Sequence, residues 1–140
     1  MVNQKKSLLK KITTAVIATT VSAVMCFPLS ASAYQGTYVN SYSQRFATES
    51  GYSTQALLVL YTKEVEAKTV IYNGAPNLCS VNVWANMKNS SGVYNRTYMG
   101  YDEGYGSAYF DTVKPNNPMK GAYCYHLAGF TSRTAKVGNY

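Results

Sequence analysis

The stretch Cys79–Lys88, CSVNVWANMK, decides the fold class of this 140-residue chain. Its odd-numbered positions carry the small or apolar side chains of Cys79, Val81, Val83, Ala85 and Met87. Its even-numbered positions carry Ser80, Asn82, Trp84, Asn86 and Lys88. Such period-two alternation is typical of a β-strand with one buried face. The turn sequence NSSG at 89–92 then predicts a hairpin partner over residues 93–101.

The rest of the chain after residue 33 has the composition of an all-β protein. All 14 Tyr and all 10 Gly lie there, and turn signals recur at residues 49–51, 73–77, 89–92, 102–104 and 114–118. Further strands are expected over residues 38–46, 107–113, 121–130 and 131–137. We therefore predict a small antiparallel two-sheet β-sandwich of seven or eight short strands.

The alternation also predicts which side chains share a face. In the first strand, Tyr38, Tyr42 and Phe46 are expected on one side. In the strand 121–130, one face is expected to carry Ala122, Cys124, His126, Ala128 and Phe130, and the other Tyr123, Tyr125 and Leu127.

Residues 54–73 are ambiguous because a short apolar run suits a buried strand or a helix equally well. Ala56–Tyr61 is such a run, and residues 62–68 have helical character with Glu64 and Lys68 at helical spacing. We predict two strands here, with a connection near residues 63–67.

Residues 1–33 have the three parts of a secretory signal peptide. A basic segment with Lys5, Lys6, Lys10 and Lys11 precedes an uncharged apolar run, and Ala31-Ser32-Ala33 forms an A-x-A cleavage site. We expect cleavage before Tyr34, secretion, and a single domain over residues 34–140. The alternatives are an uncleaved membrane anchor, for which the apolar run is short, and a lipid anchor on Cys26, which follows the bulky Met25.

The net charge of +7 falls to +3 once the leader is removed, because residues 34–140 hold nine Lys/Arg and six Asp/Glu. These charges are dispersed, whereas nucleic-acid binding requires a clustered basic stripe. A mild positive charge suits an anionic cell wall, although it also serves solubility alone. We expect neither nucleic-acid binding nor stable membrane insertion.

Cysteine usage predicts one disulfide. Cys26 leaves with the leader, so Cys79 and Cys124 remain as an even pair in an exported protein. A Cys79–Cys124 bond between the two sheets would close a loop of about 45 residues and contribute roughly 3–4 kcal/mol. A zinc site is the weaker interpretation because no further Cys or His ligands accompany the pair.

No constellation in the sequence has the parts of a catalytic site. His126 is the only histidine and lacks a matching nucleophile motif, so we interpret it as structural. Glu64 and Glu66 share a strand face beside lysines, which suggests a solvated edge. Asp102, Glu103 and Asp111 could supply calcium ligands but do not match a calcium loop. We predict no enzyme activity, no cofactor and no metal.

The tyrosines suggest a binding function. Fourteen phenols cannot all be buried with polar partners, and exposed Tyr is a rigid contact residue. The candidate binding residues are Trp84, Tyr98, Tyr101, Tyr105 and Tyr109. We expect a non-enzymatic protein that binds a cell-envelope glycan or another carbohydrate, or a surface protein. The alternatives are a bacteriocin-like antagonistic protein and an inhibitor of secreted hydrolases, and cross-strand pairing could account for the tyrosines without any ligand.

Overall fold

A computed structural model describes residues 36–73 and 77–140 of the chain. This part folds into eight β-strands and contains no helix. The strands are β1 (Tyr38–Ala47), β2 (Ser53–Tyr61), β3 (Glu64–Ile71), β4 (Leu78–Lys88), β5 (Tyr94–Tyr105), β6 (Ser107–Val113), β7 (Met119–Ala128) and β8 (Thr131–Gly138). The expected all-β class is confirmed. The predicted signal peptide and its cleavage site, with Cys26, lie outside the described residues.

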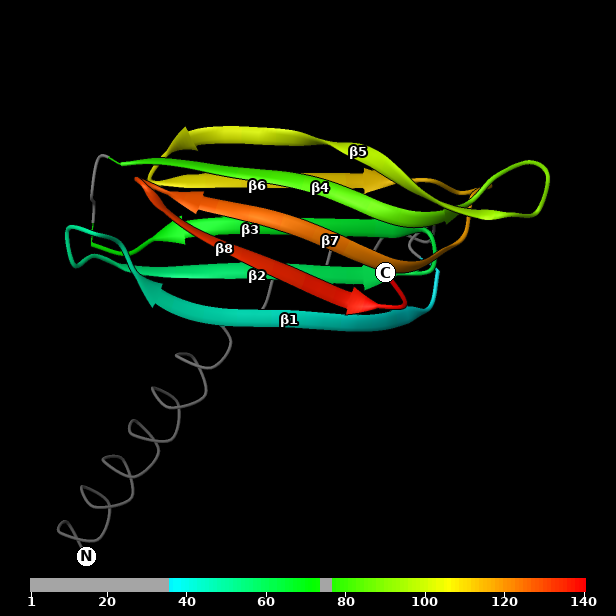
Figure 1. Ribbon diagram of the computed structural model, residues 1–140, viewed down its shortest axis with the longest axis horizontal. Helices are drawn as coiled ribbons and strands as arrows, with labels where there is room; N and C mark the ends of the chain where they lie inside the picture. The colour runs from blue at the N-terminus through cyan, green and yellow to red at the C-terminus, as the bar shows by residue number, and fades with distance from the viewer. Residues whose placement is uncertain (1–35, 74–76) are drawn as a thin grey trace, which may run out of the picture. The chain divides into compact units, whose positions relative to one another are not determined.

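The strands form two four-stranded antiparallel sheets. Sheet A has the order β1-β2-β3-β6 and sheet B the order β5-β4-β7-β8. The strand axes of the two sheets are nearly aligned, and one sheet lies behind the other (Figure 1). The β3–β4, β5–β6 and β6–β7 connections pass between the sheets, whereas the other four consecutive pairs are neighbours in one sheet.

The alternation of β4 builds the centre of sheet B. Cys79, Val81, Val83 and Ala85 point inward and are fully buried. Their side chains meet Ala56, Leu58 and Leu60 of β2, with Val65 and Ala67 of β3, in one apolar core. Burial of alternate residues from both sheets is the main stabilising contribution in such a sandwich. Because β4 lies between β5 and β7, its opposite face forms the middle of the outer surface of sheet B.

The ambiguous segment forms two strands, as predicted, but their connection is shorter than expected. Only Thr62 and Lys63 join β2 to β3, and Glu64–Ala67 already belongs to β3. Leu58 pairs with Ala67, so residues 64–68 form part of a strand although Glu64 and Lys68 have the spacing of a helical ion pair. Packing in the sheet therefore outweighs the local helical tendency. All residues of β2 from Thr54 to Tyr61 are buried, which explains the unbroken apolar run.

Two predicted face assignments are wrong, each because of a local backbone feature. A register shift between Tyr38 and Asn40 moves Tyr38 opposite Tyr61, away from the face where Tyr42 and Phe46 contact the core. Such a bulge reverses the alternation for the residues before it. Phe130 lies in the β7–β8 turn, beyond the end of β7, and is 92 % exposed.

The predicted Cys79–Cys124 disulfide is not formed, and both cysteines are free and buried. Both thiols point into the core as expected, but they lie on adjacent strands of one sheet instead of on opposite sheets. Cys124 pairs with Val83, four residues along β4 from Cys79. Four strand residues span about 13 Å, whereas a disulfide needs Cα atoms closer than about 7 Å.

Burial also makes these thiols unreactive. Desolvation raises the pKa of Cys79 to about 11 and raises that of Cys124 even further. Only a thiolate attacks a disulfide or an alkylating reagent. We therefore expect Ellman's reagent to leave Cys79 and Cys124 unmodified in the native protein and to modify both in guanidinium chloride.

The same experiment includes a reduction control. Dithiothreitol should leave the melting temperature unchanged, because no bond between Cys79 and Cys124 contributes to stability. A lower melting temperature after reduction would contradict the separation of the two cysteines in the β4–β7 register.

Candidate functional site

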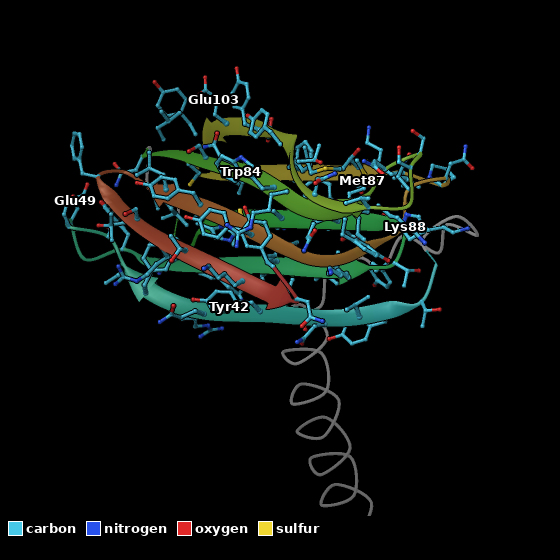
Figure 2. All side chains as sticks on the ribbon, turned by 45° about the vertical axis from the view of Figure 1, so that its right-hand side comes forward. Tyr42, Glu49, Trp84, Met87, Lys88 and Glu103 are labelled. Carbon is cyan, nitrogen blue, oxygen red and sulfur yellow. The ribbon has the colours of Figure 1, made fainter. Side chains whose placement is uncertain are left out.

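A row of aromatic side chains crosses the outer face of sheet B. Trp84 of β4 lies between Tyr98 of β5 and Tyr123 of β7, and it is their register partner on both sides. The Trp84 ring centroid lies 5.2 Å from that of Tyr98 and 5.5 Å from that of Tyr123, with tilted ring planes. Figure 2 shows Trp84 on the middle part of β4 and Lys88 toward one end of the same strand.

A second row runs parallel to the first on the same face. Asn82 lies between Tyr101 on β5 and Tyr125 on β7. Tyr98 is 51 % and Tyr101 60 % exposed, and Asn82 is half-buried. We call the face formed by these two rows the aromatic face, comprising Asn82, Trp84, Tyr98, Tyr101, Tyr123 and Tyr125.

The C-terminal residues extend the aromatic face. The Tyr140 ring stacks on Tyr123 at 5.4 Å with an interplanar angle of 19°. Asn86 donates a 2.9 Å side-chain hydrogen bond to the Asn139 carbonyl. Gly121 permits this approach, since a Cβ there would lie 2.3 Å from the Asn139 backbone.

Cationic side chains border the aromatic rings. The guanidinium of Arg96 lies 4.7 Å from the Tyr140 ring centroid, and the Lys136 ammonium lies 5.9 Å from that of Tyr123. Such cation–π contacts contribute about 0.5–1 kcal/mol each at exposed sites. They also hold positive charge over the plane of the rings, where it remains available to an anionic ligand.

The structure brings together only part of the predicted binding set. Trp84, Tyr98 and Tyr101 lie on the aromatic face, and Tyr105 lies on the same side of sheet B near the end of β5, opposite Leu78. Tyr109 does not join them, because it belongs to β6 in sheet A and pairs there with Lys68. The outer sides of the two sheets face opposite directions, so the predicted five-residue set is split between two surfaces.

Sequence reasoning missed Tyr123, Tyr125, Tyr140, Arg96 and Lys136 as members of this face. The alternation correctly predicted that Tyr123 and Tyr125 point away from the core-facing side chains of β7. The missing information was that β7 pairs with β4, a contact between residues about 40 positions apart in the sequence.

His126 lies in the core, consistent with a structural role. The Thr69 hydroxyl donates to the Ser80 carbonyl, so the 3.0 Å contact between Thr69 Oγ1 and His126 Nδ1 makes Nδ1 the donor. The buried Nε2 then carries the lone pair and has no hydrogen-bond partner in the part of the chain that the structure describes. Since a proton there would be neither solvated nor paired, burial lowers the His126 pKa to about 4.

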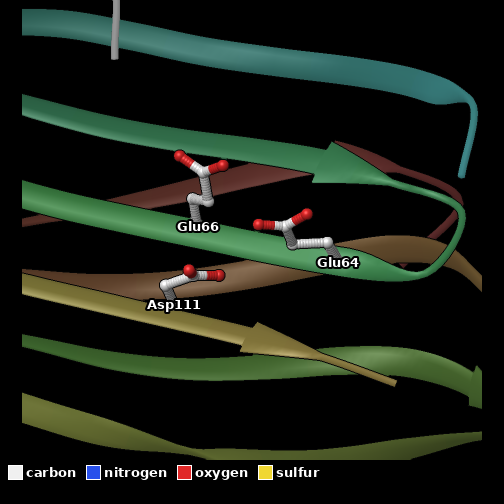
Figure 3. A group of neighbouring side chains, drawn as sticks. All are labelled: Glu64, Glu66 and Asp111. Carbon is white, nitrogen blue, oxygen red and sulfur yellow. The ribbon is translucent and has the colours of Figure 1, made fainter. Parts of the chain in front are cut away.

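A second group of polar residues, which the sequence did not predict to come together, lies on the outer face of sheet A. Glu64 and Glu66 of β3 are each only 1 % exposed, so the expectation of a solvated edge is wrong. Glu66 is the register partner of Asp111 on β6. One carboxylate oxygen from each of the three residues lies within 4.8 Å of the others, and Figure 3 shows the side chains on the same side of β3 and β6.

Asp102, Glu103 and Asp111, the calcium ligands considered from the sequence, do not come together in the structure. Asp102 accepts a 2.8 Å hydrogen bond from the Tyr109 backbone N–H, which ties β5 to β6. Glu103 lies opposite Ser80, on the outer side of sheet B (Figure 2). Asp111 instead joins Glu64 and Glu66 through the β3–β6 pairing.

Comparison with protein-family models, with curated proteins and with solved structures finds no match to this chain. Within residues 36–73 and 77–140, the structure has no helix of sufficient length and apolar character to cross a membrane.

The environment of His126 predicts a pH-dependent stability. The folded-state pKa of about 4 lies below the ordinary value of 6.5, so the unfolded chain binds the proton more tightly. Stability is therefore present above pH 6.5 and decreases as the pH falls toward 4. We expect His126 to lower the free energy of unfolding by about 1–2 kcal/mol between pH 7 and pH 5, measured by urea titration.

His126→Gln provides the comparison, because its amide can donate to Thr69 without titrating. The pH-dependent difference between the two proteins isolates His126 from the carboxylates. An equal loss of stability in both proteins would contradict the low folded-state pKa of His126.

Proposed function

We propose that this is a non-enzymatic binding protein whose aromatic face holds a cell-envelope glycan. The observation that supports this most directly is the continuous row Tyr98–Trp84–Tyr123 across three strands, with the second row beside it. Aromatic rings on a rigid sheet provide broad contact area with little loss of side-chain entropy on binding.

The chemistry of the face suits a sugar chain. The C–H faces of a pyranose ring are apolar and pack against aromatic rings, while its hydroxyls need hydrogen-bond partners. Asn82 and the phenol groups of Tyr101 and Tyr125 lie in the row beside Trp84 and offer both donors and acceptors. Polar groups set among aromatic rings are the combination that fixes the orientation of such a ligand.

The charge of the face favours an anionic glycan. Arg96 and Lys136 lie over its rings, and Lys88 shares the outward side of β4 with Trp84. Attraction between exposed charges weakens with ionic strength, so binding driven partly by these cations should decrease at high salt. Stacking on Trp84 depends less on salt, which allows the two contributions to be measured separately.

The long basic segment of residues 1–11, with its two lysine pairs, resembles the secretory signals of Gram-positive bacteria. Cosedimentation with washed Gram-positive cells and with purified cell wall therefore tests the proposal. Trp84→Ala and Tyr98→Ala should each weaken wall binding about tenfold or more, as loss of a central aromatic contact does. Phe130→Ala, which removes a highly exposed aromatic ring from the β7–β8 turn, should bind like the unmodified protein.

Each variant's melting temperature is measured alongside, because the Trp84 pairs also stabilise the sheet by roughly 0.2–1 kcal/mol each. Weak binding by a folded Trp84→Ala variant supports a ligand-binding role for the face. Unchanged binding by that variant, or no binding to wall by any form, contradicts the proposal. Binding that disappears when the cells are treated with trypsin beforehand indicates a protein partner instead of a glycan.

A further inference from the structure

We propose that Glu64, Glu66 and Asp111 hold one calcium ion on the outer face of sheet A. This site is separate from the aromatic face, which lies on the outer side of the other sheet. One oxygen from each carboxylate lies within 4.8 Å of the other two (Figure 3).

The strand register brings the three carboxylates together. Glu64 and Glu66 are two residues apart on β3 and therefore share a face, and β6 pairs Asp111 with Glu66. Neighbouring strands lie about 4.7–4.9 Å apart, so like charges directly opposite one another destabilise the sheet. A bound cation removes this repulsion.

Glu66 is the register partner of Asp111 and is itself buried. It is 1 % exposed, so its carboxylate is removed from water. Hydrogen bonds with the Glu64 and Tyr109 side chains compensate part of this burial, but neither side chain carries a positive charge. An ionised carboxylate in such a position requires a positive partner.

Tyr61 provides an observation that is independent of the acidic residues. Its side chain is 6 % exposed, and its hydroxyl is buried without a hydrogen-bond partner among residues 36–73 and 77–140. Tyr61 lies two residues along β2 from Val59, the register partner of Glu66, so its side chain shares the outer face of sheet A with Glu64 and Glu66. A water molecule bound to the cation would provide the partner that this hydroxyl lacks.

The ligand set and its spacing favour calcium. Carboxylate oxygens suit hard cations, and the three acidic side chains offer no nitrogen or sulfur. Calcium–oxygen distances of 2.3–2.6 Å allow two ligands of one ion to lie up to about 5 Å apart, a condition that the 4.8 Å limit meets. Magnesium demands near-ideal octahedral geometry, retains several waters and is usually held by one or two carboxylates, so three protein carboxylates suit calcium better.

Thermal unfolding of the protein tests the site, with calcium alone as the probe. At about 5 mM CaCl₂ we expect the melting temperature to rise by about 5 °C, for an affinity typical of extracellular calcium modules. The same concentration of MgCl₂ should produce a clearly smaller rise. Terbium, excited through Tyr61 and Tyr109, should luminesce when bound and be displaced by calcium.

Glu66→Gln and Asp111→Asn should each abolish the calcium-dependent rise, whereas Glu103→Gln makes the same charge change on the other sheet and should keep it. Without calcium, Glu66→Gln should melt at the same or a higher temperature, because it removes a buried like charge, so its lost response cannot be attributed to misfolding. The proposal is overturned if calcium has no effect, if magnesium acts equally, or if Glu66→Gln responds like the unmodified protein.

Discussion

The register between β4 and β7 is the constraint on which both the core and the aromatic face depend. It sets Val83 opposite Cys124 on the inner side and Trp84 opposite Tyr123 on the outer side. The first pairing keeps the two thiols four residues apart, and the second completes the aromatic row. A slip of one residue would turn Trp84 inward and Val83 outward, at a large cost in buried apolar area. The packing of the core therefore also positions the proposed binding residues.

The largest acidic and basic clusters lie on different sheets, although the outer face of sheet A also carries Lys68 and that of sheet B carries Glu103. Sheet B carries Lys88, Arg96 and Lys136 around its rings, whereas Glu64, Glu66 and Asp111 gather on sheet A. The two clusters lie on opposite sides of a buried layer about 10 Å thick, so a ligand of one cluster does not compete for space with a ligand of the other. The net charge of +3 for residues 34–140 conceals this separation, because it adds the charges of both faces.

The sequence was sufficient for features that depend on neighbouring residues. Period-two alternation located the strands, and β6 was predicted with the bounds that the structure shows. Features that depend on strand pairing were not predictable in this way. The inward direction of Cys79 and Cys124 was correct, but whether they meet depends on the β4–β7 register. The separation of Tyr109 from Tyr98 and the meeting of Asp111 with Glu66 likewise follow from pairings across sheet A, and the position of Tyr38 follows from a bulge.

The composition of β3 is hard to explain by sheet stability alone. Glu is a poor strand former, and Glu66 lies between Val59 of β2 and Asp111 of β6. An aliphatic residue at position 66 would pack against Val59 without a desolvation cost, and buried charges are frequently replaced by apolar residues with no loss of stability. Departures from locally favourable residues are expected at functional positions, where an interaction outside the fold offsets their cost. A shared calcium ion would do so for all three residues at once, because it converts repulsion between adjacent strands into common coordination.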